Sequence, residues 1–106
     1  MAFTIDISRK DDVVKITLGG ELDATSADAF REKIEEAARL TPQRLVILAD
    51  QLTFMASAGL RALIFAKQKM GENVSVFVVG AKGPVLRTLT MSGFHHAIHL
   101  QDTYAE

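Results

Sequence analysis

Hydrophobic and polar positions alternate at the start of the chain and predict a β-hairpin. The segment FTIDIS, residues 3–8, places Phe3, Ile5 and Ile7 at every second position, which is the period of a strand with one buried face. After the polar turn RKDD the alternation resumes in VVKITL, residues 13–18. Two such runs joined by a short polar turn indicate antiparallel strands. We expect Gly19 and Gly20 to end the second strand.

The pattern then changes to helical spacing. Thr25, with Asp28 three residues later, resembles the capping box that begins a helix, and Pro42 marks its end. The apolar positions behind this start share one predicted helix face and are Ala27, Phe30, Ile34, Ala37 and Ala38.

Two uninterrupted apolar runs predict central strands buried on both faces. They are RLVILAD, residues 44–50, and VSVFVVG, residues 74–80. Residues 57–70 between them predict a helix that Gly71 terminates. Gly83-Pro84 begins a short helix that Gly93 ends, and AIHL, residues 97–100, predicts a last strand. The order β-β-α-β-α-β-α-β predicts an α/β fold, with a mixed sheet, right-handed crossovers and helices packed on the sheet.

Composition narrows the class of protein. The chain has 106 residues, 48% of them hydrophobic and 24% charged, which fits one compact domain with its core at about residues 3–100 and a short tail at 101–106. The formal charge of -1 argues against a general nucleic-acid binder. The absence of cysteine excludes disulfides and thiol chemistry. With no signal-peptide pattern and no run long enough to span a bilayer, we expect a cytoplasmic protein without membrane contact.

Ser57 is the one hydroxyl in an almost wholly apolar stretch at the predicted start of the 57–70 helix. One interpretation is an N-cap. Another is a phosphorylation site, because free N–H groups at a helix start accommodate a phosphate and Arg61 lies one turn later. Helical projection places a mixed face around Ser57 that suits a docking patch better than plain solvent. Its further members are Ala58, Arg61, Ile64, Phe65 and Gln68.

Three other kinds of chemistry are disfavoured. The G-x-S-x-G elbow of hydrolases is half present, since Met55 replaces its first glycine and Asp102 follows every histidine, so we expect no catalytic residue. The cluster His95, His96 and His99 lacks a nearby carboxylate or cysteine, so we expect no metal site. Gly80 and Gly83 match no phosphate-loop motif, so we expect no cofactor.

Three segments together resemble the STAS domain of bacterial anti-sigma-factor antagonists. They are GGELDATSADAFREKI, RLVILADQLTFMASAGLRALIFAKQK and VVGAKGPVLRTLTMSGFHHAIHL, and the likeness covers about residues 3–100. GELD after the second strand and FM-x-S-x-GL at the strand-to-helix junction are fairly specific in combination. In the family, the serine of the second motif is the phospho-acceptor, and it matches Ser57 here.

The resemblance implies a non-enzymatic partner switch. The unphosphorylated antagonist would bind an anti-sigma factor that is also a GHKL-type serine kinase, and so release a sigma factor for transcription. Phosphorylation of Ser57 would break that complex, and a serine phosphatase would restore it. Asp23 of GELD matches a family acid near the acceptor and the partner surface, although a turn residue is an equal interpretation.

Ala56 departs from the family pattern, which has Asp directly before the acceptor. An acid there would stabilise the helix start and shape what the kinase recognises. The partner surface implied by the resemblance therefore comprises Asp23, Ala56, Ser57, Ala58, Arg61, Ile64 and Phe65. The alternative is a STAS-like structural subunit of a lipid-transport ATPase or a stress-signalling scaffold, without regulated phosphorylation. A weak homodimer stays open.

Overall fold

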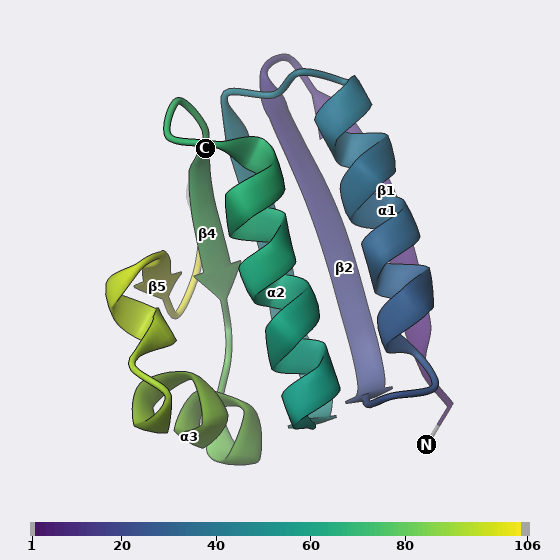
Figure 1. Ribbon diagram of the computed structural model, residues 1–106, viewed down its shortest axis with the longest axis vertical. Coiled ribbons are helices and arrows are strands. Elements are labelled where there is room, and N and C mark those ends of the chain that lie inside the picture. The colour runs from purple at the N-terminus through teal and green to yellow at the C-terminus, as the bar shows by residue number, and fades with distance from the viewer. Residues whose placement is uncertain (1, 105–106) are drawn as a thin grey trace.

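The chain folds into one five-stranded sheet with helices packed on it, in a computed structural model that describes residues 2–104 (Figure 1). The strands are β1 (Thr4–Lys10), β2 (Val13–Leu22), β3 (Arg44–Met55), β4 (Ser75–Val79) and β5 (His99–Gln101). The helices are α1 (Ala27–Arg39), α2 (Ser57–Met70) and α3 (Gly83–Met91), followed by the short 3-10 helix η1 (Phe94–His96). The predicted element order and the α/β class are confirmed.

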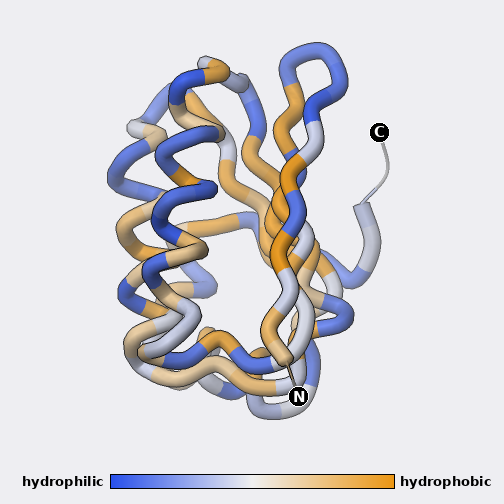
Figure 2. The backbone as a smooth tube through the Cα atoms, turned by 90° about the vertical axis from the view of Figure 1, so that its right-hand side faces the viewer, coloured by the Kyte–Doolittle hydropathy of each residue, from blue (hydrophilic) through white to orange (hydrophobic). Residues whose placement is uncertain are grey.

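The sheet is mixed, as predicted. Its strand order is β1-β2-β3-β4-β5, with β1 antiparallel to β2 and every other neighbouring pair parallel. Figure 2 shows the two long helices on one side of this sheet and the C-terminal segment on the other. The four parallel strands therefore end at one edge of the molecule, and α2 and α3 begin there.

The main core lies between the sheet and its helical layer. The predicted apolar face of α1 supplies Phe30, Ile34 and Ala37, and all three side chains are fully buried. They meet Ile16 of β2 and Ile47 of β3, which alternate toward the helices with the pleat of their strands. Burial of this stripe, more than intrinsic helix propensity, holds α1 in place.

The glycines of β2 do not end the strand, contrary to the sequence prediction. β2 continues through Gly19 and Gly20 to Leu22. A Cβ atom at Gly19 would lie 2.5 Å from Oγ1 of Thr4, and Gly20 has a φ of 81° with Ala2 packed against it. The glycines are therefore required by close packing and by irregular pairing with β3, where the register shifts twice.

Three other predicted boundaries were wrong. β3 does not stop at Asp50 but reaches Met55, because its far end stays paired with the extended end of β2. α1 does not begin with a capping box at Thr25 and Asp28: its N-cap is Ser26, which makes no side-chain capping bond. The last strand is His99–Gln101 and not residues 97–100, since η1 takes up the chain before it. Residues 105–106 of the predicted tail lie outside the described residues.

Candidate functional site

The two segments singled out by the sequence meet where β2 and β3 end side by side. Leu22 pairs with Met55, and the N–H of Ala56 donates a 2.9 Å hydrogen bond to the carbonyl oxygen of Leu22. Asp23 therefore follows β2 directly beside the start of α2. A Cβ at Gly59 would lie 2.7 Å from Cγ of Leu22, so α2 rests on β2 without room for a side chain.

Ser57 is the first residue of α2, and its side chain is exposed. The N-cap is Ala56, with extended backbone and no capping side chain. Within residues 2–104 the Ser57 hydroxyl makes no hydrogen bond, so the interpretation of Ser57 as a cap was wrong. What the structure presents at the helix start is an exposed hydroxyl, and no acidic residue occupies the first turn of α2.

Asp23 organises the turn between β2 and α1. Its Oδ1 accepts hydrogen bonds from the N–H and hydroxyl of Thr25, at 3.0 and 2.7 Å, and from the N–H of Ser26 at 3.3 Å. Hydrogen bonding by the Thr25 hydroxyl is the main cause that lowers the pKa of the Asp23 carboxyl below its ordinary value of 3.8, against an opposing effect of desolvation. The half-buried Asp23 is therefore a fixed negative charge beside the Ser57 helix start.

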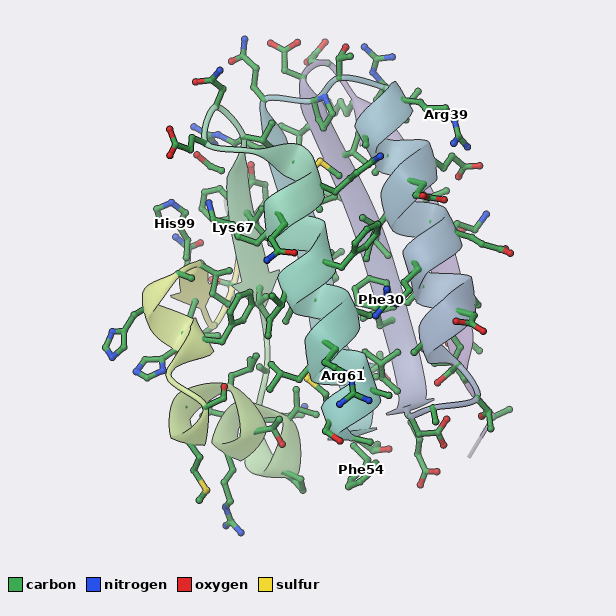
Figure 3. All side chains as sticks on the ribbon, viewed as in Figure 1. Phe30, Arg39, Phe54, Arg61, Lys67 and His99 are labelled. Carbon is green, nitrogen blue, oxygen red and sulfur yellow. The ribbon has the colours of Figure 1, made fainter. Side chains whose placement is uncertain are left out.

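The exposed face of α2 is narrower than helical projection indicates. Ser57, Arg61 and Gln68 are exposed, and Ile64 between them is half-buried. We call Ser57, Arg61, Ile64 and Gln68 the α2 stripe. Figure 3 shows Arg61 near the start of α2, on the side away from the sheet.

Phe65 is turned aside from this stripe and packs against the core, with the guanidinium of Arg31 from α1 lying 5.3 Å from its ring centroid. Ala56 and Ala58 are half-buried at the helix start. The structure thus gathers Asp23, Ala56, Ser57, Ala58 and Arg61 where α2 begins. It places Ile64 further along the helix and Phe65 in the contact between α1 and α2.

Phe54 is a site residue that the sequence prediction missed. Its side chain is 44% exposed and lies at the same end of the molecule as Arg61 (Figure 3). β3 has one residue more than β2 between Leu52 and Phe54, and this bulge breaks the alternation, so that Leu52 and Met55 are buried while Phe54 faces solvent. No feature of the local sequence reveals such a bulge.

Helix α3 borders the same edge, and its contribution was also missed. The hydroxyl of Thr88 donates to the carbonyl oxygen of Met55, at 3.4 Å. Met91 of α3 is 80% exposed, a value that apolar periodicity alone does not reveal. A shallow hollow of about 400 Å³ separates the end of β3 from the start of α3, and it is lined by Asp50, Gln51, Leu52, Thr53, Lys82, Gly83 and Pro84.

The other candidate chemistry is not brought to this edge. His95 and His96 lie in η1 with ring centroids 3.9 Å apart, and His99 of β5 stacks on Phe77 of β4 with ring centroids 4.7 Å apart. Among the described residues no three His, Cys, Asp or Glu side chains are grouped so that they could hold a metal ion. Over the same residues, no helix combines the length and apolar character needed to cross a membrane.

Comparison with known proteins identifies the family. The family model described as "STAS domain" matches residues 4–106. An anti-sigma-F factor antagonist of Mycobacterium tuberculosis, RsfB, is 28% identical over 102 residues, covering 96% of this chain and 84% of the relative. An anti-sigma F factor antagonist of Paenibacillus polymyxa is 31% identical over 107 residues, with 96% and 89% covered.

A solved structure agrees with these matches. The crystal structure of an anti-sigma factor antagonist from Mycobacterium paratuberculosis superposes with a TM-score of 0.88 at 28% identity, covering 96% of this chain and 87% of that one. Similarity in sequence and in fold therefore extends over nearly the whole chain. The chain belongs to the STAS domain family, and its close homologues are named anti-sigma factor antagonists.

Proposed function

We propose that this protein is an anti-sigma factor antagonist whose partner is an anti-sigma factor that also acts as a GHKL-type serine kinase. The kinase phosphorylates Ser57 and thereby ends the complex, and a serine phosphatase reverses the step. Binding leaves a sigma factor free for transcription. The homologues named anti-sigma factor antagonists support the general role.

One observation carries the proposal: the Ser57 hydroxyl is exposed and has no hydrogen-bond partner in the part of the chain that the structure describes. A serine that served the fold would use its hydroxyl as a cap or bury it. Ser57 does neither, and it stands at the edge where Asp23, Arg61 and Phe54 gather.

The fold can accept a phosphate at this position. The backbone N–H groups of the first turn of α2 have no carbonyl partner within the helix, and the helix dipole favours negative charge there. No acid in that turn opposes it, since Ala56 carries no charge, and Arg61 follows one turn later. Phosphorylation therefore adds about −1.5 to −2 charges without breaking any bond that holds the structure together.

Phosphorylation of Ser57 lowers the affinity for the partner rather than the stability of the fold. A partner that covers the α2 stripe contacts a neutral hydroxyl, one guanidinium and the half-buried Ile64. A dianionic group at Ser57 has to be desolvated or repelled when the same partner returns. Asp23 supplies a preformed negative charge at the other side of the site, which suits a basic residue of the partner.

The first test is the intact mass of the protein after incubation with ATP and the candidate kinase, beside the Ser57→Ala variant. We expect a gain of one phosphate in the wild type and none in the variant. Ser57→Ala should keep the free energy of unfolding within about 0.5 kcal/mol of wild type, because no capping bond is lost. Ser92→Ala is the matched control, since Ser92 is a second exposed serine near a helix end.

Affinity measurements complete the test. Ser57→Glu should weaken binding of the anti-sigma factor by about tenfold or more, while Ser57→Ala should bind like wild type. If no phosphate is gained and the complex forms normally, the protein is an unregulated STAS-like structural subunit, and the phosphorylation step of the proposal is wrong.

A further inference from the structure

Helix α3 presents an exposed stripe beside the start of α2 that the proposed phosphorylation does not use. Pro84, Arg87 and Met91 are exposed at a spacing that puts them on one side of the helix, and we call them the α3 stripe. Met91, at 80%, and Phe54, at 44%, are the exposed large hydrophobic residues among those described. Large hydrophobic side chains that remain in solvent in the folded chain present a surface suited to contact.

The α3 stripe adjoins the end of β3, which leads into α2 and the α2 stripe. Thr88 lies on the flank of α3 beside Met91, and its hydroxyl holds the carbonyl oxygen of Met55, two residues before Ser57. The lining of the hollow between β3 and α3 includes Thr53, the neighbour of Phe54 in the chain, and Pro84 of the α3 stripe. Both helices start at the lower edge in Figures 1 and 3, so one partner can cover both stripes at once.

The charges on this surface indicate which kind of partner segment it can bind. Arg61, Lys82 and Arg87 are exposed and form no ion pair with any residue from 2 to 104. Neither α2 nor α3 has an acidic residue in its first turn, whereas α1 has Asp28 there. Two positive helix ends and three cations therefore lie along one edge. The acids that face it are Asp50, which lines the hollow, and Glu21 and Asp23, which lie toward α1.

We propose that the α3 stripe is the second half of the docking surface, and that it receives an acidic segment of the anti-sigma factor that also carries apolar side chains. This inference rests on the proposed function. Carboxylates of that segment pair with Arg61 and Arg87, and its apolar side chains cover Met91 and Phe54. Apolar contact supplies affinity at the centre of such a surface, and the charges supply specificity and rate of association.

An acidic segment also explains why a phosphate ends the complex. Ser57 lies one turn before Arg61, so its phosphate competes for the guanidinium that a partner carboxylate occupies. The added charge then repels the remaining carboxylates of the segment. With a basic partner segment at this place, the same phosphate would strengthen binding.

The experiment measures affinity of the full chain for the candidate anti-sigma factor kinase from the same genome, without ATP. Arg87→Glu and Met91→Glu should each weaken binding by about tenfold or more. The matched control is Arg39→Glu, an exposed arginine at the far end of α1, which should bind like wild type. Circular dichroism melting of each variant checks that the fold is intact.

Four further outcomes decide between the two proposals. Loss of binding in Arg61→Glu with wild-type affinity in both α3 variants overturns the α3 docking surface and leaves the proposed function standing. Wild-type affinity in all three variants would show that the partner docks elsewhere, which overturns the α3 docking surface and the placement of the partner on the α2 stripe. Tighter binding of Arg87→Glu would show a basic segment opposite α3, which contradicts the inference, whereas restored binding of Arg87→Glu by an acid-to-lysine change in the partner would establish it.

Discussion

Ser57 and Asp23 are two polar residues at neighbouring chain turns, and the fold uses them in opposite ways. Oδ1 of Asp23 accepts hydrogen bonds from Thr25 and Ser26 and thereby fixes the turn that leads into α1. The hydroxyl of Ser57 makes no hydrogen bond within residues 2–104. By chemistry alone each residue suits a structural role, a helix cap for Ser57 and a turn for Asp23. The hydrogen bonds therefore give Asp23 a structural role and leave the Ser57 hydroxyl available for modification or contact.

The lowered pKa of Asp23 gives a prediction at this scale. Thr25→Val removes the hydroxyl donor and should raise the pKa of the Asp23 carboxyl back toward 3.8. The measurement is an NMR titration of the side-chain carboxyl carbon. Thr90→Val is the matched control, because the hydroxyl of Thr90 bonds only to carbonyls of α3.

The same shift sets a pH dependence of stability. Folding lowers the pKa, so ionised Asp23 stabilises the native state above the ordinary value of 3.8, and this contribution is lost as pH falls through the lower folded-state pKa. In Thr25→Val the free energy of unfolding should therefore fall less steeply as the pH is lowered. An unchanged carboxyl pKa in Thr25→Val would contradict the role given to the hydroxyl.

At the scale of elements, the irregular pairing of β2 with β3 builds the site. β3 carries an extra residue between Leu48 and Gln51 and another between Leu52 and Phe54, relative to β2. These bulges carry the strand to the edge, turn Phe54 outward and deliver the chain to Ala56, whose N–H bonds to Leu22. A regular ladder would have placed Phe54 and Leu52 on one face.

Gly59 tests how closely α2 rests on β2. Within a helix, glycine-to-alanine substitution usually gains about 1 kcal/mol. Here the new Cβ would lie 2.7 Å from Cγ and 2.8 Å from the carbonyl oxygen of Leu22, so Gly59→Ala should instead lower the free energy of unfolding by about 1–3 kcal/mol.

Urea unfolding followed by circular dichroism measures this change, with Ser57→Ala as the control in the same helical turn. A Gly59→Ala variant as stable as the wild type would mean that α2 can move away from β2 at little cost. The position of Ser57 would then not be fixed by that contact.

At the scale of the whole molecule, residues 2–104 form a sheet with a helical layer on one face and the C-terminal segment on the other (Figure 2). Tyr104 lies over this second face, where Nη1 of Arg44 donates to its hydroxyl at 3.2 Å and the ring of Phe77 meets its ring edge-on at 5.5 Å. The ammonium of Lys15 is 5.5 Å from the same ring. Tyr104 and Arg44 also line a hollow of about 210 Å³, at the start of β2 and β3 and so opposite the end that carries Ser57.

Tyr104→Ala should therefore lower the free energy of unfolding by about 1 kcal/mol, since it removes both the ring contacts and the hydrogen bond from Arg44. Tyr104→Phe keeps the ring and should cost less than Tyr104→Ala. Urea unfolding of the two variants beside the wild type makes the comparison. Equal stability of all three would show that the segment is not anchored to the sheet, and neither variant should change binding at the Ser57 edge.

The sequence by itself determined the order and type of the elements. Period-2 alternation at Ile5 and Ile7 and helical spacing at Phe30 and Ile34 survive in the structure, because each element must bury one apolar face. Gly71 ends α2 as predicted, with a φ of 80° that suits glycine. The sequence also placed Asp23 after the second strand and Ser57 at a strand-to-helix junction.

Only the tertiary structure decided what each residue at that edge does. The bulges that expose Phe54, the contact that turns Phe65 toward Arg31, and the close approach of Leu22 that requires Gly59 all depend on a neighbour distant in sequence. Local periodicity cannot encode such a neighbour, since it describes one element at a time. The exposed Ser57 hydroxyl and the α3 stripe result from the way α2 and α3 pack at the end of β3. These contacts form only in the folded chain.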